Sequence, residues 1–264
     1  MVGSTQSGGI ILLINLSWYF NGLTLVSHSS SDSSIPGKQP HAKRVKRWNE
    51  LNDILAKNRK HKNNSTAYSY ISWNDVKSVF NTVPYTQEVK EVPDNVLEVL
   101  STYLKYAAKV FGSVTTGNEA HRLHLISPII VCVCSLFEGE ITIDVEEDLN
   151  GDYIKAHGHF EFVLRRGDKR VCIVEAKKDD MEQGMAQDLL GCEVAADIGY
   201  QPSFDVRKLN VVCGIVTNYC GWNFLRSLDE KIELEECTID LDHGVPTDAS
   251  LLKISGKIYK MLSD

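Results

Sequence analysis

The chain has 264 residues, of which 43% are hydrophobic and 24% are charged, and its formal net charge at pH 7 is −7. This composition is that of an ordinary globular protein, and it excludes a chain that is disordered throughout. The negative net charge disfavours unaided long-range attraction to a polyanion. A length of this size favours one main domain with an extension.

Residues 1–40 are predicted to form an N-terminal extension that is apolar at first and Ser-rich afterwards. The apolar run Gly8–Val26 has about the length of a signal-peptide core, but no Lys or Arg precedes Lys38. Asn15 and Asn21 interrupt the run, and it lacks the flanking charges of a membrane span, so we predict no membrane segment. Two alternatives stand for this region: a cleaved leader, or a packed or disordered extension.

Residues 41–116 are predicted to hold a basic segment and then a helical cover. Between His41 and Lys62 there are eight Lys or Arg and two acids, a net charge of +6, so the rest of the chain carries −13. The two clusters KRVKR and KNRKHK resemble a bipartite nuclear-localisation signal or a phosphate-binding patch. The alternative is a solvated linker. The predicted nucleic-acid-binding residues are Lys43, Arg44, Lys46, Arg47, Lys57, Arg59, Lys60 and Lys62.

Two helices are predicted after the basic segment. Residues 71–80 have helical spacing, and residues 93–111 repeat apolar side chains every three to four positions after the start signal Pro93-Asp94. We expect both helices to pack on the main domain, residues 117–264, as a cover.

From residue 117 the pattern changes to alternating helices and strands. The predicted elements are a helix at 118–137 that Pro128 kinks or interrupts, a strand at 139–149, two strands within 157–178, a helix at 179–196, strands at 208–218 and 231–241, and a helix at 248–262. The strand at 231–241 alternates like an edge strand. Gly184 and Gly191 lie two helical turns apart and are expected to allow close helix packing. This order predicts an α/β fold, a mixed sheet flanked by helices, with an N-terminal helical extension.

The two strands within residues 157–178 carry glutamates where a buried strand should stay apolar. The run that precedes Glu175-Ala176-Lys177 is apolar, and Glu161 lies across the turn. Directly opposed residues in an antiparallel pair share a face, so the two glutamates share one only if the loop has an odd number of residues. We therefore predict a three-residue loop, Gly167–Lys169, with Glu161, Glu175 and Lys177 on one face. The residues predicted on the other face are Phe160, Phe162, Cys172 and Ala176.

Two carboxylates that converge beside a sheet interior repel each other and lose hydration, so a positive charge must compensate. A divalent metal such as Mg²⁺ does so, because it prefers hard oxygen ligands. Lys177, two residues after Glu175, could then orient a metal-bound water or stabilise charge on a phosphate. The alternative is a plain salt bridge between neighbouring strands.

The order of a glutamate on a helix, an acid on a strand and then Glu-x-Lys on the next strand resembles the PD-(D/E)XK nuclease superfamily. More narrowly, FEFVL, VCIVEAKKDDMEQGMAQDLLG and VCGIVTNYCGWNF are similar to the nuclease-like C-terminal domains of Crinkler-type effector proteins. The resemblance covers roughly residues 117–228. It implies a restriction-endonuclease-like fold for the domain at 117–264.

The resemblance also implies roles for individual residues. Glu119, Glu161 and Glu175 would bind Mg²⁺ or Mn²⁺, and Lys177 would orient the attacking water or stabilise developing charge. Gln187 matches a glutamine that supports the site or the nucleic acid. The second acid of the family is usually aspartate, whereas Glu161 is longer by one methylene.

The function implied is metal-dependent hydrolysis of phosphodiester bonds in DNA or RNA, by a Crinkler-like effector that acts in the nucleus, that of a host after secretion. The alternative is a catalytically degenerate effector domain that binds nucleic acid or a host nuclear protein. A cytoplasmic location is the alternative to the nuclear one. The chain contains no G-x-x-x-x-G-K-[ST], so a phosphate-loop ATPase is excluded.

Overall fold

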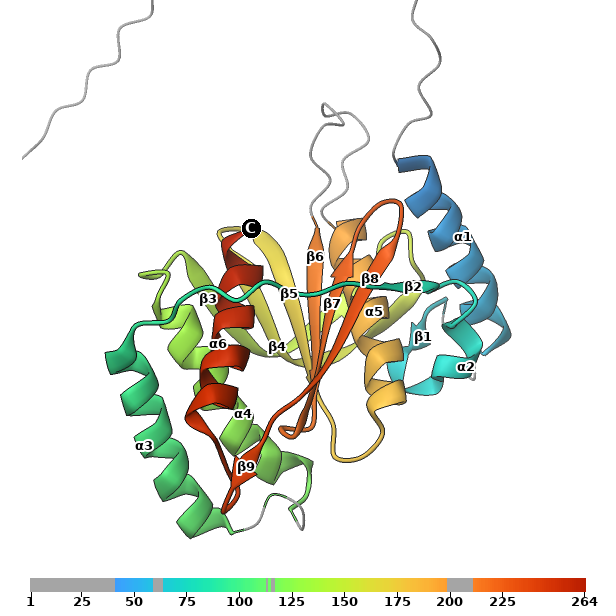
Figure 1. Ribbon diagram of the computed structural model, residues 1–264. Helices are drawn as coiled ribbons and strands as arrows, with labels where there is room; N and C mark the ends of the chain where they lie inside the picture. The colour runs from blue at the N-terminus through green and yellow to red at the C-terminus, as the bar shows by residue number, and fades with distance from the viewer. Residues whose placement is uncertain (1–40, 59–63, 113, 115–116, 199–210) are drawn as a thin grey trace, which may run out of the picture. The chain divides into compact units, whose positions relative to one another are not determined.

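The computed structural model in Figure 1 describes residues 41–58, 64–112, 114, 117–198 and 211–264. The predicted N-terminal extension, residues 1–40, lies outside this range. Among the described residues, no helix is long and apolar enough to cross a membrane. From residue 41 on, the structure confirms an α/β fold with a mixed sheet, flanking helices and a helical N-terminal region.

A single mixed sheet of eight strands forms the centre of the described chain. Its strands are β1 (Thr66–Ala67), β2 (Thr82–Pro84), β3 (Ile141–Asn150), β4 (Ala156–Arg166), β5 (Lys169–Ala176), β6 (Val212–Thr217), β7 (Gly221–Ser227) and β8 (Ile232–Thr238). The order across the sheet is β1-β4-β5-β6-β7-β8-β2, and β3 also pairs with β4. The pairs β5–β6, β1–β4 and β2–β8 are parallel and the others are antiparallel. A separate small hairpin joins β9 (Leu241–Asp242) to β10 (Val245–Pro246).

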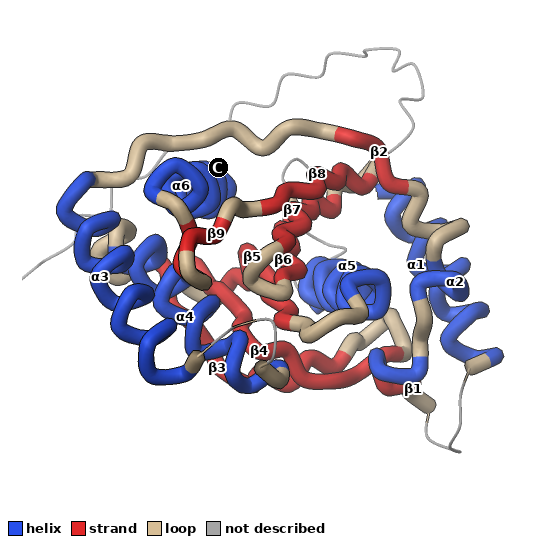
Figure 2. The backbone as a smooth tube through the Cα atoms, turned by 60° about the horizontal axis from the view of Figure 1, so that its bottom comes forward, coloured by secondary structure: helices blue, strands red, loops and turns tan. Residues whose placement is uncertain are grey.

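Helices cover both faces of the sheet (Figure 2). They are α1 (His41–Lys57), α2 (Trp73–Val76), α3 (Asp94–Phe111), α4 (Glu119–Ser135), α5 (Met181–Ile198) and α6 (Asp248–Ser263), with a short 3-10 helix, η1 (Tyr68–Tyr70). One face packs against α3, α4 and α6 and includes Ile130 and Trp222 in its core. The other face packs against α5, α1 and α2 and includes Trp48 and Leu189. The sheet therefore has a hydrophobic core on each side.

Local signals in the sequence set several helix ends. Asn118 precedes α4 and its side chain accepts a hydrogen bond from His121 N at 2.9 Å. Thr247 caps α6 in the same way, accepting from Ser250 N at 3.3 Å. Gly112 ends α3 with a φ of +83°, a conformation that glycine adopts without strain. These caps explain why the helices predicted near 93–111, 118–137 and 248–262 are confirmed.

The structure differs from the sequence analysis in several elements. Residues 41–57 form a helix, which rules out the alternative of a solvated linker for this part of the basic segment, and the helix predicted at 71–80 is only the single turn α2. Strand β7 was not predicted, because both of its faces are buried and its sequence does not alternate. Strand β8 consequently lies between β7 and β2 and is not an edge strand. Pro128 does not interrupt α4, which continues to Ser135.

An extended segment, residues 85–93, joins β2 to α3 and crosses over α6 (Figure 1). At the crossing, a Cβ added to Gly256 would lie 2.6 Å from Lys90 O, so glycine allows the two backbones to approach. The buried Lys257 ammonium donates to Gln87 O at 2.8 Å and to both carboxylate oxygens of Glu235 at 2.7 Å. This ion pair fixes the segment to α6 and β8.

Candidate active site

The hairpin of β4 and β5 has a two-residue turn rather than the predicted three-residue loop. Arg166 pairs with Lys169 across Gly167 and Asp168, and Gly167 has a φ of +58°. A two-residue turn alone would place Glu161 opposite Val174.

A β-bulge changes this register. Arg165 pairs with Arg170 but Leu164 pairs with Cys172, so Val171 is an extra residue in β5. Beyond the bulge, Phe162 pairs with Val174, and the next residues along the two strands are Glu161 and Glu175. The predicted outcome, two glutamates on one face, therefore holds, but the bulge produces it and not the loop length.

The opposite face of the hairpin agrees with the prediction except at one residue. Phe162, Cys172 and Ala176 lie in the core beneath α4 and α6. Phe160 lies instead in the core beneath α5, with its ring centroid 5.1 Å from that of Tyr68. The alternation of side chains between the two faces of β4 is broken between Phe160 and Phe162. Strand β4 pairs with β5 only from Phe162 onward. On the other side of β4, Glu146 of β3 lies across from Glu161 and has a φ of +53°, which is irregular for a strand.

Four predicted site residues meet at one end of the sheet. Lys177 Nζ lies 2.5 Å from Glu175 Oε1 and 3.5 Å from Glu119 Oε1. Glu161 Oε2 accepts a hydrogen bond from the backbone N–H of Ala176 at 3.2 Å, which places it beside Glu175. Glu119 is the first residue of α4, so the capped start of that helix supplies the third carboxylate. We call Glu119, Glu161, Glu175 and Lys177 the carboxylate–lysine cluster.

Burial controls the protonation of the cluster. Glu175 is 4% exposed, and this burial raises its pKa well above the usual value, with a further increase from the charge of Glu161 and from a hydrogen bond with it. Burial by itself would lower the pKa of Lys177, but Glu175 in the first place, and then Glu161 and Glu119, raise it overall. We therefore treat Lys177 as the cation of the cluster, and Glu175 as a carboxyl group that holds its proton more tightly than an ordinary glutamate.

The cluster fits a hard divalent cation in its chemistry. Within the described part of the chain, Glu175 Oε2 and Gln187 Oε1 are buried without a hydrogen-bond partner. Carboxylate oxygens are the ligands that Mg²⁺ and Mn²⁺ prefer. As placed, however, Lys177 supplies the positive charge, and no three or more His, Cys, Asp or Glu side chains of the described residues are arranged to hold an ion. Ligation by Glu175 through both oxygens would therefore require Lys177 to move away from it.

Helix α5 packs closely on this end of the sheet, as the two glycines predict. A Cβ on Gly184 would lie 2.6 Å from Val216 Cγ1 and 2.9 Å from Lys177 Cγ. A Cβ on Gly191 would lie 2.4 Å from Phe160 Cζ. Larger residues at either position would push the helix off the sheet, and Gly184 in particular leaves room for the stem of Lys177 between α5 and the strands.

Gln187 and its neighbour Asp188 lie on α5. Gln187 is partly exposed, and its Oε1 is buried without a hydrogen-bond partner among the described residues, so no hydrogen bond of that oxygen links it to the carboxylate–lysine cluster. Asp188, which the sequence reasoning missed, is fully buried, and burial raises its pKa well above the usual value. A Cβ added to Gly214 in β6 would lie only 1.8 Å from Asp188 Oδ2, so a glycine is needed there for the carboxylate to fit. A glycine within the valine-rich β6 was the signal for this close approach.

Two residues of the predicted nucleic-acid-binding set are structural. Arg44 and Arg47 are 1% and 8% exposed, and both contact Glu193, which is fully buried. Arg47 Nη2 lies 2.8 Å from Glu193 Oε1, and Trp48 Nε1 donates to Glu193 Oε2 at 2.6 Å. Arg44 and Arg47 are therefore removed from the predicted phosphate-binding surface, because they attach α1 to α5 and β7.

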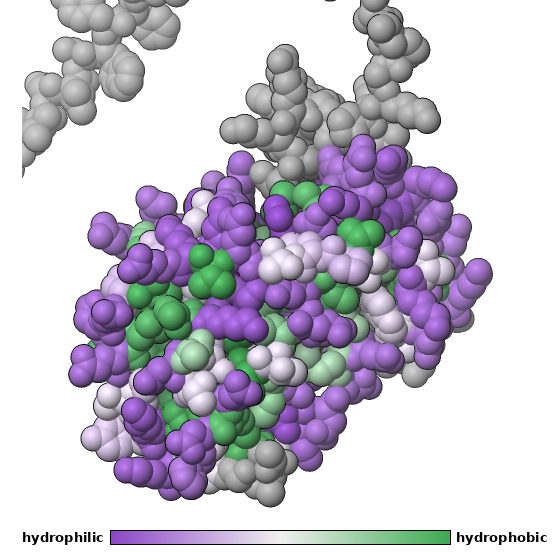
Figure 3. Space-filling model, viewed as in Figure 1, coloured by the Kyte–Doolittle hydropathy of each residue, from purple (hydrophilic) through white to green (hydrophobic). Residues whose placement is uncertain are grey.

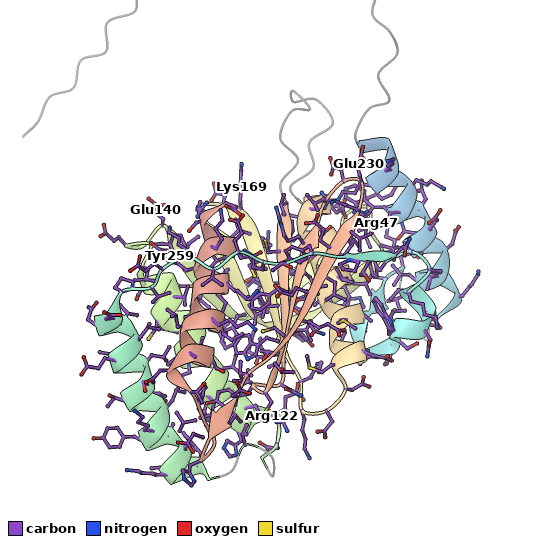
Figure 4. All side chains as sticks on the ribbon, in the orientation of Figure 1. Arg47, Arg122, Glu140, Lys169, Glu230 and Tyr259 are labelled. Carbon is purple, nitrogen blue, oxygen red and sulfur yellow. The ribbon has the colours of Figure 1, made fainter. Side chains whose placement is uncertain are left out.

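The remaining predicted basic residues differ in position. Lys43, Lys46 and Lys57 are exposed on α1. Arg59, Lys60 and Lys62 lie outside the described residues. In Figure 4, Arg47 on α1 is labelled at the upper right, and Arg122, which follows Glu119 by one turn of α4, is labelled in the lower part of the view. The first half of α1 packs on Glu193 in the second half of α5, whereas Lys177 packs on Gly184 near the start of α5, so these basic residues lie away from the carboxylate–lysine cluster.

Fold and cluster together define an α/β protein with three carboxylates and a lysine gathered at one end of a mixed sheet. The chain is 44% identical over 230 residues to Crinkler effector protein 5 of Phytophthora infestans, and the match covers 85% of this chain and 64% of that protein. The chain thus spans less than two thirds of the length of this relative. The similarity supports a Crinkler-like relationship. No family model and no solved structure matches the chain.

Proposed function

We propose that the chain is a metal-dependent phosphodiesterase of the PD-(D/E)XK kind that cleaves DNA or RNA. The observation that carries the proposal is the carboxylate–lysine cluster, in which α4, β4 and β5 bring one lysine and three glutamates together although they are distant in sequence. A Glu-x-Lys pair that occurs by chance on one strand has no reason to lie beside two further glutamates from distant parts of the chain, as Glu175 and Lys177 do with Glu119 and Glu161.

Each residue of the cluster has a separate task in this proposal. Glu119, Glu161 and Glu175 hold the ion, and a bound Mg²⁺ or Mn²⁺ supplies Lewis-acid polarisation of the phosphate and a nucleophilic water. Lys177 places its ammonium beside the scissile phosphate and offsets the negative charge that develops there. Glu161 also fixes the end of β5 through the backbone N–H of Ala176, which limits the freedom of both glutamates. Gln187 is assigned to support of the nucleic acid or of the site.

A second candidate is a catalytically degenerate domain that binds nucleic acid or a host nuclear protein. The 2.5 Å ion pair between Lys177 and Glu175 favours it, because the buried carboxylate already has a positive partner without any metal. In either case we propose a Crinkler-like effector role, since the similar protein is named an effector. We place that role in the nucleus of a host after secretion, with the cytoplasm as the alternative, because the exposed lysines of α1 belong to the basic clusters that resemble a bipartite nuclear-localisation signal.

A cleavage assay tests the proposal with plasmid DNA and with RNA in Mg²⁺, Mn²⁺ or EDTA. We expect wild-type protein to cut at least one of them with either metal and neither in EDTA. Lys177→Met should reduce the rate by about 100-fold or more, since it removes a group that offsets transition-state charge. Lys178→Met is the matched control, because Lys178 is half-exposed and lies outside the cluster, so it should cut like wild type. Cleavage in EDTA, or full activity of Lys177→Met, would contradict the proposal. Binding without cleavage would favour the second candidate.

The exposed lysines of α1 give a separate prediction about nucleic-acid affinity. Replacing Lys43, Lys46 and Lys57 with glutamine should flatten the plot of log affinity against log salt concentration by up to roughly one unit for each phosphate that the protein no longer binds. Arg44 and Arg47 are left intact because they are buried. Titrations of labelled DNA and RNA at several salt concentrations measure the slope, and Lys253→Gln on α6 serves as an exposed control. An unchanged slope would mean that the lysines bind no phosphate.

A further inference from the structure

Arg122 on α4 is a nearly buried cation beside the carboxylate–lysine cluster. It is 5% exposed and follows Glu119 by one helical turn, so the two side chains leave the same side of α4. Glu119 Oε1 lies 3.5 Å from Lys177 Nζ. Two residues after that lysine, Asp179 Oδ1 lies 3.9 Å from Arg122 Nη2. The guanidinium group of Arg122 therefore borders the proposed active site.

The charge of Arg122 lacks a close and buried partner. A buried charge in a protein is normally paired with an opposite charge, as Arg47 is with the fully buried Glu193 at 2.8 Å. In the part of the chain that the structure describes, the acid in ion-pair contact with Arg122 is Asp179 alone, and its side chain is 77% exposed. Solvent screens such a pair, and Asp179 also lies 3.8 Å from Lys178. A second, closer anion would therefore be stabilised beside this guanidinium group.

The turn between β6 and β7 holds the guanidinium group in place. Arg122 Nη1 donates a hydrogen bond to Asn218 O at 2.9 Å. The side chain of Asn218 fixes the turn, since its Oδ1 accepts from Cys220 N at 3.1 Å and from Gly221 N at 2.7 Å. Tyr219, at the centre of the turn, is fully buried with a φ of +75°, which bulky residues rarely adopt. Arg122 is thus held in position before any ligand binds, and this lowers the entropy cost of binding.

We propose that Arg122 binds a phosphate of the nucleic acid next to the scissile phosphate and so positions the strand in the active site. The role rests on the proposed nuclease function, and it belongs to a residue that contacts the substrate rather than the metal. A guanidinium group stays charged and forms short, strong hydrogen bonds with phosphate oxygens. The phosphate replaces the Asp179 carboxylate beside Nη2, and that exposed carboxylate turns into the solvent. In Figure 3, hydrophilic side chains form the surface where Figure 1 places the segment from β5 to α5, so the strand approaches over a hydrated surface.

Titrations of labelled DNA and RNA in EDTA, where the proposed enzyme does not cut, measure this contact. Arg122→Gln should weaken the affinity by about tenfold or more and reduce the slope of log affinity against log salt concentration by about one unit. Arg170→Gln is the matched control, because Arg170 is also mostly buried but has Glu147 at 2.9 Å, so it should bind like wild type. In the cleavage assay, Arg122→Gln should raise KM more than it lowers kcat and should leave the metal dependence unchanged.

A second variant keeps the test independent of the folding of Arg122→Gln. Asp179→Asn removes the exposed acid that occupies the position of the phosphate, so it should tighten binding by about two- to fivefold. Glu182→Gln, which removes an exposed acid from the first turn of α5, is the control and should tighten binding less. When combined with Arg122→Gln, Asp179→Asn should have little effect, because both residues act on the same phosphate.

The outcomes separate this role from the proposed nuclease function. Unchanged affinity and slope in Arg122→Gln, additive effects of the two substitutions, or equal gains from Asp179→Asn and Glu182→Gln would overturn the phosphate contact, even if wild type cuts DNA or RNA. A wild type that binds through Arg122 but cuts neither would support the phosphate contact and contradict the nuclease function. A wild type that binds no nucleic acid, with or without Mg²⁺, would overturn both.

Discussion

Replacing Glu175 with glutamine should abolish metal-dependent cleavage and leave the protein at least as stable as wild type in EDTA. The activity should fall by about a thousandfold or more, because the proposed site loses a buried ligand and with it the stabilisation of transition-state charge. The stability should not fall, because the substitution removes one of two carboxylates that are close together and buried. Lys177 keeps Glu119 at 3.5 Å, so it retains an anionic partner.

The stability difference should depend on pH. The pKa of Glu175 is raised above its ordinary value of 4.5 by burial and by Glu161, so the native state binds this proton more tightly than the unfolded chain does. The stabilisation from that proton is complete below pH about 4.5 and is lost as the pH rises through the raised pKa. Glutamine does not titrate, so the advantage of Glu175→Gln over wild type should grow with pH in that window.

Thermal melts with and without metal complete this experiment. Wild type should gain about 2.7 kcal/mol when Mg²⁺ or Mn²⁺ is present at a hundred times its dissociation constant, and Glu175→Gln should gain much less. Glu140→Gln, at an exposed position, is the control and should behave like wild type. A structural salt bridge predicts the opposite result: the variant is destabilised and metal has no effect on either protein. That outcome would contradict the nuclease proposal.

Replacing Glu193 with glutamine should lower the free energy of unfolding by about 3–5 kcal/mol, the largest stability effect that we expect. The side chain is fully buried, and it accepts hydrogen bonds from Arg47 at 2.8 Å, Trp48 at 2.6 Å and Ser227 at 2.5 Å. Glutamine keeps the volume but leaves the buried guanidinium groups without this anion. Chemical denaturation followed by circular dichroism measures the change.

The matched control is Glu230→Gln. Glu230 also pairs with a basic residue of α1, Lys43, at 3.2 Å, but both side chains are more than half exposed. Solvent screens such a pair, so its removal should leave stability almost unchanged. Equal effects at Glu193 and Glu230 would mean that the buried ion pairs do not attach α1 to the domain.

The sequence by itself determined the elements whose signals are local. The helices α3, α5 and α6 follow from 3.6-residue periodicity and, for α3 and α6, from capping residues, which depend only on neighbours in the chain. The glycines at 184 and 191 likewise indicated a helix that packs closely on the sheet. The sequence also indicated that Glu119 on a helix and Glu161 and Glu175 on two successive strands could come together, since adjacent strands of a sheet bring their ends to the same edge.

Only the tertiary structure decided the register of the hairpin and the use of the basic residues. The bulge at Val171 moves every later residue of β5 by one position, and no local sequence signal marks it. Arg44 and Arg47 look like their exposed neighbours Lys43 and Lys46, but helical geometry turns them toward Glu193, 146 residues beyond Arg47. Strand β7 has no alternation because helices cover both faces of the sheet. These features depend on packing between segments that are distant in the chain. A charge pattern or a periodicity within one segment does not show which other segment packs against it.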